Sequence, residues 1–403
     1  MACTHPHFLS HRIRFSFPSL HIPKTITVNP NTPLNPTPIV SPSLRSFAHS
    51  PSKPAPPSSP VVSGTISSSS FTWDDVVRIS QPEYAPNDSS DLSGFFDKIK
   101  LCNRGSEMQS KFIPFVIEDQ IVGYVHNGFV EHLKRFKDVF IFPQSDSYSG
   151  RFGGYVTVHS SLNSPESRTG AVAEVIKCFG EERLIPGIRN ELYPVTPYFG
   201  APVYFSLERA AAPYFGIKAY GVHMNGYVER DGEKFLWIGK RSQVKPTFPG
   251  MLDHLVAGGL PHGISSGENI IKECEEEAGI PESLSHKAIP VGAVSYMDID
   301  GVRYKRDVLF CYDLKLPENF VPNNQDGEVE SFKLIPVTNV ANIIRRTQFF
   351  KPNCSLVIID FLFRHGYFLV ASAFIPDARR RYITPECCGY LGLLQSLRSG
   401  DCS

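Results

Sequence analysis

The stretch GGLPHGISSGENIIKECEEEAGI, residues 258–280, contains most of the chemistry that the sequence of this 403-residue chain reveals. Ser265 is followed three residues later by Glu268, a capping-box pattern which predicts that a helix begins there. Gly279 suits the end of that helix. The stretch therefore predicts two glycines, a short loop and an acidic helix. Its five glutamates are Glu268, Glu273, Glu275, Glu276 and Glu277.

The faces of this helix differ in their chemistry. At about 100° per residue, Glu273, Glu276 and Glu277 share one face. The neighbouring arc is apolar and is expected to pack on a sheet; it holds Ile270, Ile271, Cys274 and Ala278. Glu268 and Lys272 are expected to form an ion pair on the remaining face. Glu275 is expected to point to solvent.

Three clustered carboxylates without a cation on their face favour a hard divalent ion, Mg²⁺ or Mn²⁺. Such an ion at a glycine-rich turn suits hydrolysis of a phosphoanhydride, because it lowers the pKa of the attacking water. A solvated acidic helix fits the helical pattern alone equally well. The preceding glycines and loop favour the metal site.

The stretch resembles the Nudix box: Gly, five residues, Glu, seven residues, then Arg-Glu-U-x-Glu-Glu-x-Gly-U, where U is aliphatic. Gly258 takes the opening position, and the closing half is matched in register by Glu273, Glu276, Glu277, Gly279 and Ile280. The resemblance implies a metal-dependent hydrolase whose ligands to Mg²⁺ or Mn²⁺ are Glu273, Glu276 and Glu277. It also implies an α/β/α sandwich with a mixed sheet.

Three positions depart from the box. Ile264 stands where the family has its first Glu, Lys272 replaces the Arg, and Cys274 replaces an aliphatic residue. In the family that Glu and Arg usually pair and brace the loop. We expect a Lys272–Glu268 pair to brace the loop here.

The resemblance extends over nearly all of the chain after its first 70 residues. The segments LWIGKRSQVKPTFPG and FKPNCSLVIIDFLFRHGY are similar to plant plastidial Nudix proteins related to the Nudix module fused to fungal thiamine pyrophosphokinase. This similarity implies hydrolysis of diphosphate-linked compounds, oxidised or damaged thiamine diphosphate analogues above all. Two other interpretations stay open: a non-catalytic Nudix-like binding module, and an enzyme like isopentenyl diphosphate isomerase, although MLDHLVAGG lacks the cysteine that the isomerase needs.

The first acidic residue of the chain is Asp74, and the 73 residues before it contain 15 Ser and 13 Pro with five basic residues. This composition is typical of a plastid transit peptide and lacks the apolar block of a secretory signal; a disordered linker is the alternative. Nine scattered cysteines without a CxxC pair favour a reducing compartment. We expect a chloroplast protein.

Four ranges are expected. Residues 1–70 form a disordered transit segment, 71–215 a smaller α+β accessory domain, 216–366 the α/β Nudix domain, and 367–403 a C-terminal extension. Within the accessory domain, residues 112–125 predict two strands around an Asp-containing turn, and residues 170–187 predict a helix ending near Gly180. Phe368–Arg381 resembles an insertion and is assigned no function.

The composition also bears on partners. A net charge of zero argues against nucleic-acid binding. No apolar stretch could span a membrane, and the oligomeric state is open.

Several further residues are candidates for the site. Arg241, Lys245, Gly258 and Gly259 are expected to contact the substrate. Lys240 joins them in a loop whose charges suit a diphosphate, and a solvated basic turn is the alternative. Glu328 is either a metal-binding or basic carboxylate or an ordinary strand-edge residue. His254 is interpreted as structural. Arg189, Glu191, Glu208 and Arg209 are weaker candidates, since nothing in their spacing supports substrate contact.

Overall fold

The structure is a computed structural model of the chain, and it describes residues 71–88, 91–144, 154–368 and 392–400. The expected transit segment and all but the first residue of Phe368–Arg381 lie outside the described residues. Within the described part of the chain, no helix has the length and apolar character that a bilayer span requires.

The strands in chain order are β1 Phe112–Ile117, β2 Gln120–His126, β3 Phe140–Ile141, β4 Thr157–Val158, β5 Leu192–Val195, β6 Phe205–Glu208, β7 Lys218–Arg230, β8 Glu233–Arg241, β9 Leu252–Asp253, β10 Val256–Gly259, β11 Ile289–Asp300, β12 Arg303–Lys315 and β13 Val329–Pro336.

The helices are α1 Trp73–Ser80, α2 Ser93–Cys102, α3 Asn127–Leu133, α4 Pro165–Glu181, α5 Ala212–Phe215, α6 Ser266–Ala278, α7 Glu282–Ser285, α8 Val337–Arg346 and α9 Pro352–Arg364, with 3₁₀ turns at Pro82–Tyr84, Ser106–Lys111 and Arg209–Ala211.

A mixed seven-stranded sheet forms the centre of the C-terminal domain, in the order β11-β12-β7-β8-β13 with β10 beside β7 and β9 beside β8. Strand β7 pairs parallel with β12 and antiparallel with β8 and β10. Strands β11 and β12 form a long antiparallel hairpin over Asp300-Gly301. The mixed α/β sheet expected from the sequence is thereby confirmed.

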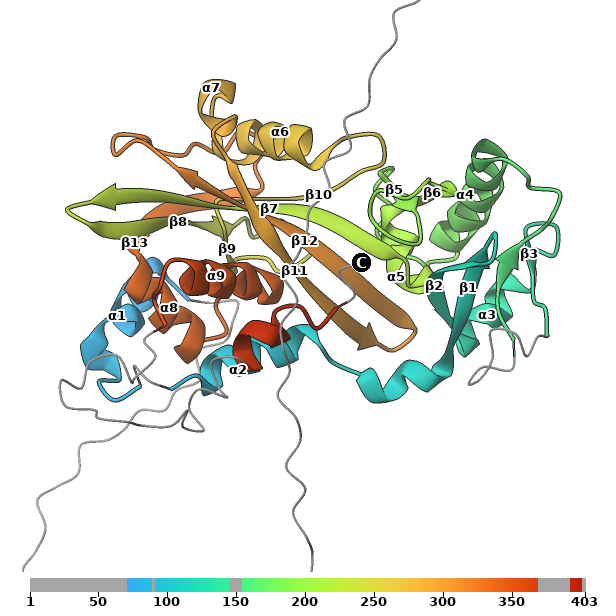
Figure 1. Cartoon of the computed structure of the whole chain (residues 1–403), viewed down its shortest axis with the longest axis horizontal. Coiled ribbons are helices and arrows are strands. Elements are labelled where there is room, and N and C mark those ends of the chain that lie inside the picture. The colour runs from blue at the N-terminus through green and yellow to red at the C-terminus, as the bar shows by residue number, and fades with distance from the viewer. Residues whose placement is uncertain (1–70, 89–90, 145–153, 369–391, 401–403) are drawn as a thin grey trace, which may run out of the picture. The chain divides into compact units, whose positions relative to one another are not determined.

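Helices cover both faces of this sheet, α6 on one side and α8 with α9 on the other (Figure 1). Alternate residues of β12 enter the two cores because successive side chains of a strand point to opposite faces. Leu309 and Cys311 pack in the core with α8 and α9, and Tyr312 and Leu314 pack in the core with α6. The sheet is therefore buried on both faces, as in an α/β/α sandwich.

The segment Leu252–Gly259 forms two short strands, β9 and β10, separated by two residues. The carboxylate of Asp253 accepts the backbone N–H of His254 at 2.9 Å, so this part of the chain leaves the strand ladder. Strand β9 pairs with β8, whereas β10 pairs with β7. The chain thus changes its pairing partner from β8 to β7 before it reaches the glycines of β10.

The expected accessory range, residues 71–215, contributes to two large hydrophobic cores and, through Phe112, to a small cluster with Ile299 and Tyr304. Residues 115–217 share one core, which includes the expected hairpin β1–β2 and helix α4. Helices α1 and α2 instead pack with α8 and α9 in the C-terminal domain through Val76, Ile79, Phe95 and Ile99. Leu393 and Leu397, from the expected C-terminal extension, are buried in that same core. We call residues 112–217 the accessory fold.

Helix α4 ends at Glu181, close to the expected Gly180, but it begins earlier than expected, at Pro165. The reason is a capping box in which Ser164 and Ser167 exchange side-chain and backbone hydrogen bonds. A Ser at the third helical position in place of Glu or Gln hid this signal in the sequence.

Candidate functional site

Strand β10, a six-residue loop and helix α6 form the centre of the candidate site. The capping box expected from the sequence is confirmed, because the Ser265 hydroxyl accepts the Glu268 N–H at 3.2 Å and the Glu268 carboxylate accepts the Ser265 N–H at 3.0 Å. The helix ends at Gly279, whose φ of 60° favours glycine. The local sequence therefore sets both ends of the helix that carries the acidic face.

Glu277 is the most buried carboxylate of α6, with 9% of its surface exposed. One of its oxygens accepts the backbone N–H of Ala257 at 2.7 Å, which ties the helix to β10. Burial raises the pKa of Glu277 well above its usual range, and nearby carboxylates, Glu273 among them, add to the rise. No ion pair to Glu277 is found among the described residues. The ionised form of Glu277 is therefore unfavourable in free energy unless a cation binds beside it.

Glu273 occupies the space beside Gly258. A Cβ added at Gly258 would overlap the carboxylate of Glu273, so glycine is needed there to let this side chain lie against β10. Burial raises the pKa of Glu273 and the neighbouring Glu276 raises it further, while the charge of Lys272 partly opposes the rise. Two of the three expected ligands therefore have raised pKa values for the same physical reason.

The expected ion pair between Lys272 and Glu268 is wrong. The Lys272 ammonium pairs with Glu276, one turn later, and lies 3.7 Å from Glu273. Glu268 is unavailable because its carboxylate is held by the capping box. The acidic face is therefore not free of cations, and Lys272 reaches its exposed edge. Glu275 is exposed, as expected.

Ile264 packs on Tyr220, Leu260 and Val308. Ile264 stands at the position of the first glutamate of the box, and its apolar side chain cannot form an ion pair with Lys272. The loop is held instead by Asn269 of α6, whose amide donates to the carbonyl oxygen of Gly259 at 2.7 Å. The geometry of the loop is thus maintained by packing and a buried amide.

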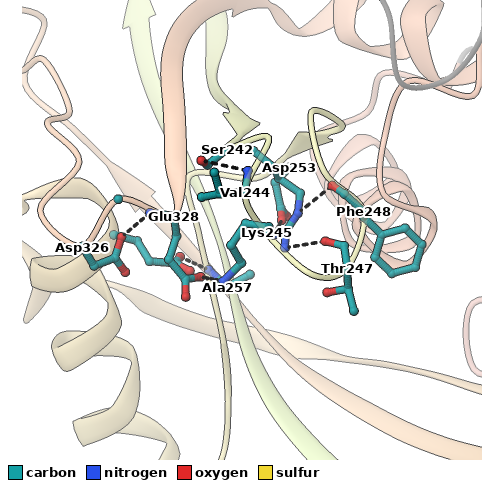
Figure 2. A network of polar contacts seen from close by, with 12 residues as sticks. Ser242, Val244, Lys245, Thr247, Phe248, Asp253, Ala257, Asp326 and Glu328 are labelled. Atoms are coloured by element: carbon teal, nitrogen blue, oxygen red, sulfur yellow. Dashed lines mark hydrogen bonds and ion pairs between the residues drawn. The ribbon is translucent and has the colours of Figure 1, made fainter. Parts of the chain in front are cut away.

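Lys245 and Glu328 meet next to Ala257, the residue that anchors Glu277 (Figure 2). The two side chains form an ion pair, and the Lys245 side chain is largely buried whereas that of Glu328 is 41% exposed. Glu328 also contributes to the raised pKa of Glu277. The structure therefore brings together α6, the loop after β8 and the segment before β13, which lie far apart in the sequence.

Comparisons with known proteins agree with this geometry. A model described as NUDIX domain matches residues 220–352, and one described as Domain of unknown function (DUF4743) matches residues 94–219. The chain is 66% identical over 336 residues to "Nudix hydrolase 20, chloroplastic" from Arabidopsis thaliana, which covers 83% of this chain and 85% of the relative. The chain belongs to the Nudix hydrolase family.

Two more similarities accompany this one. "Nudix hydrolase 24, chloroplastic" from the same plant is 62% identical over 336 residues, covering 83% of this chain and 86% of the relative. The NUDIX domain of Shewanella oneidensis NrtR, solved in complex with ADP ribose, is 14% identical, covers 38% of this chain and 90% of that chain, and has a TM-score of 0.29. The names of both plant relatives confirm the expected chloroplast localisation.

Arg241 of this Nudix hydrolase is engaged inside the protein. Its guanidinium donates to Asp253 at 2.8 Å and to the carbonyl oxygens of Phe248 and Thr247 at 3.1 and 3.0 Å. These contacts shape the loop that carries Lys245. Substrate contact by Arg241 stays a prediction, and its role in this structure is to hold that loop.

A buried polar cluster that the sequence did not reveal lies beside β9. His223 Nδ1 is 2.8 Å from His254 Nε2, and the Cys354 thiol donates to Asp253 at 2.6 Å. Potential ligand atoms of the two histidines and Cys354 lie within 4.8 Å of one another.

Positive charge surrounds this cluster, because Arg241 and Lys351 both pair with Asp253. A further cation would be repelled by them, so we assign the cluster a structural role. This agrees with the interpretation of His254 from the sequence. The members come from three separate segments of the chain, and no spacing pattern could have grouped them.

The acidic face of α6 suits a divalent cation better. Nudix hydrolases generally use divalent metal cations, and carboxylate oxygens are the ligands that Mg²⁺ and Mn²⁺ prefer. Glu277 is buried and has no ion pair with any residue that the structure describes, and Glu273 lies beside it with a raised pKa. The donor atoms present in this Nudix hydrolase therefore fit the metal that the family uses.

Proposed function

We propose that this Nudix hydrolase cleaves a diphosphate bond, with Mg²⁺ or Mn²⁺ held by Glu273, Glu276 and Glu277. The observation that carries the proposal is Glu277, a buried carboxylate with a strongly raised pKa and a backbone N–H as its partner. A carboxylate kept in that state lowers the stability of the metal-free protein. A site for a cation accounts for that cost.

The protein groups around the site have distinct roles in this proposal. Ala257 orients Glu277 through its backbone N–H, and Gly258 leaves room for Glu273. The bound ion would neutralise charge on the phosphates and lower the pKa of a water molecule. Glu328 is a partly exposed carboxylate within electrostatic range of Glu277 and is proposed to accept the proton of that water. Its partner Lys245 is proposed to contact a phosphate oxygen.

The substrate class follows from the resemblance to plastidial proteins related to the Nudix module fused to fungal thiamine pyrophosphokinase. We propose oxidised or damaged thiamine diphosphate analogues, or other compounds of the nucleoside-diphosphate type, as substrates. Residues 1–70 are proposed to be the transit peptide that leads to the plastid stroma.

Phosphate release by the full chain from a panel of compounds tests the activity. The panel contains thiamine diphosphate, its oxidised analogues, ADP-ribose, NADH and coenzyme A, each with Mg²⁺ and with Mn²⁺. We expect the highest kcat/KM with an oxidised thiamine diphosphate. A higher kcat/KM with ADP-ribose or NADH would contradict the proposed substrate but still support the proposed hydrolase activity. Fusion of residues 1–73 to a fluorescent reporter tests the proposed transit peptide, and a cytosolic signal would contradict plastid targeting.

A non-catalytic binding module is the second candidate, favoured by Ile264 and Lys272 at two positions of the box. In that case the panel would bind without release of phosphate under either ion. Calorimetric titration of each compound with Mn²⁺ present separates the two functions.

A further inference from the structure

The β5–β6 hairpin of the accessory fold contacts the loop between β10 and α6. The backbone N–H of His262, in this loop, donates to the carbonyl oxygen of Leu192 in β5 at 2.8 Å. The Nδ1 atom of the His262 ring lies 2.6 Å from the hydroxyl of Ser206 in β6. Two hydrogen bonds therefore attach the loop to both strands of the hairpin.

Gly259, the last residue of β10, lies directly against the accessory fold. A Cβ added there would overlap the Tyr193 hydroxyl and lie 3.1 Å from the guanidinium carbon of Arg209. The preceding residue, Gly258, leaves the same kind of space for Glu273. Two adjacent glycines thus allow a carboxylate of α6 and a cation of the accessory fold to reach the end of one strand.

The guanidinium of Arg209 is held in a fixed orientation. Its Nη1 donates to Glu191 at 2.6 Å, and its carbon atom lies over the Tyr193 ring, 5.5 Å from the centroid. Among the described residues, Glu191 is its hydrogen-bond partner, and 36% of the side chain is exposed. A guanidinium has five N–H donors, so most of them are available to a ligand.

Electrostatics also connect Arg209 with the acidic face. Burial by itself lowers the pKa of Arg209, but the surrounding acidic groups, Glu273 among them, raise it. The guanidinium therefore stays charged within electrostatic range of an expected metal ligand. A cation and a carboxylate at such a distance suit a ligand that carries both phosphates and a bound metal ion.

We propose that Arg209 contacts a phosphate group of the substrate and that the β5–β6 hairpin forms one wall of the diphosphate site. Arginine suits this role because its planar fork forms paired, charge-assisted hydrogen bonds to phosphate. Glu191 and Tyr193 are positioning residues for it. The inference rests on the proposed diphosphate chemistry, and it gives the region matched as a domain of unknown function a part in substrate recognition.

The test compares Arg209→Ala, Arg209→Lys and, as control, Lys177→Ala in the full chain. Lys177 is an exposed cation on α4 of the same accessory fold. Steady-state kinetics with the best substrate of the panel should show a KM about tenfold higher for Arg209→Ala, equivalent to about 1.4 kcal/mol. Arg209→Lys should lie between, since it keeps the charge and loses the fork, and Lys177→Ala should match the unmodified chain.

Mn²⁺ affinity, measured by electron paramagnetic resonance, separates substrate contact from a structural role. Loss of a cation near Glu273 should leave Mn²⁺ binding unchanged or tighter. An unchanged KM would overturn the inference. So would a joint loss of Mn²⁺ affinity and thermal stability in Arg209→Ala, because that result means that the residue only holds the domains together.

Binding of inorganic pyrophosphate in the presence of Mn²⁺ keeps this test separate from the hydrolase proposal. If the chain binds pyrophosphate without hydrolysing any compound, about tenfold weaker binding by Arg209→Ala still supports the inference. Equal binding by the variant overturns it even when hydrolysis is confirmed. Absence of pyrophosphate binding by the unmodified chain also overturns it.

Discussion

Asp253 and Glu277 are both buried carboxylates of the C-terminal domain, with 6% and 9% of their surfaces exposed, yet their pKa values move in opposite directions. Burial alone would raise the pKa of Asp253, but Lys351 and Arg241 outweigh it and hold that pKa well below its usual range. Glu277 has no such cationic partner in the described part of the chain, so burial raises its pKa.

The difference lies in where the balancing charge comes from. Asp253 pairs with two cations of the protein, Arg241 at 2.8 Å and Lys351 at 3.4 Å. These cations favour its ionised form. Among the described residues, the hydrogen-bond partner of the Glu277 carboxylate is the backbone N–H of Ala257. One acid therefore stabilises the protein, while the other is proposed to await an ion from solution.

The largest effect is expected when Asp253 is changed to Asn. Arg241 and Lys351 would then face each other without a buried counter-charge, so the free energy of unfolding should fall by about 3–5 kcal/mol in urea titrations at pH 7. The control is Glu229→Gln, which breaks an exposed pair with Lys315 and should cost no more than about 1 kcal/mol. Equal losses in the two variants would contradict the comparison.

Glu277→Gln is expected to act in the opposite direction on stability. The amide oxygen can still accept the Ala257 N–H, but a ligand charge is lost, so kcat/KM should fall about a hundredfold or more. The metal-free variant should have a higher melting temperature at neutral pH than the unmodified chain. Glu275→Gln, an exposed neighbour on α6, should change neither quantity.

The same variant provides a pH test. The raised pKa means that the native state binds more protons than the unfolded chain, so the stability of the metal-free protein should fall as pH rises from the ordinary glutamate value of 4.5 through the raised value. Thermal unfolding in a chelator between pH 5 and pH 8 should show this slope, and Glu277→Gln should flatten it. A slope of the other sign would mean that Glu277 has a cationic partner.

Gly258→Ala changes the position of a carboxylate and leaves its charge intact. The new methyl group would overlap Glu273, so Mn²⁺ affinity should fall about tenfold. Gly267→Ala is the matched control on α6, where an added Cβ meets nothing within 4 Å, and it should stabilise the helix by up to about 1 kcal/mol. If Mn²⁺ affinity is unaffected by Gly258→Ala, Glu273 is not a ligand in the geometry described.

The smallest effect is expected from Lys272→Ala. Its ammonium pairs with Glu276 and lies near Glu273, where it competes with a bound ion, so Mn²⁺ affinity should rise about twofold. Lys287→Ala, an exposed lysine outside α6, should leave affinity unchanged. Weaker binding by Lys272→Ala would show that the lysine braces the loop instead.

Much of the site could be predicted from the sequence because the relevant signals are local. The capping box at Ser265, the glycine at the end of α6 and the shared face of three glutamates all follow from helix geometry. The pairing of Lys272 could not be predicted, since Glu268 and Glu276 lie equally far from it along the helix. The capping box occupies Glu268, and this decided the pair.

The sequence by itself determined the acidic helix, its two ends, the glycines before it and the α/β class of the C-terminal domain, because spacing along the chain sets which side chains share a face. Only the tertiary structure decided which carboxylates have cations. It placed Arg241 and Lys351 beside Asp253, whereas no cation of residues 71–88, 91–144, 154–368 or 392–400 pairs with Glu277. It also brought Arg209 to Gly259 from another fold. Burial and charge balance depend on segments that are distant in sequence, and no local pattern encodes them.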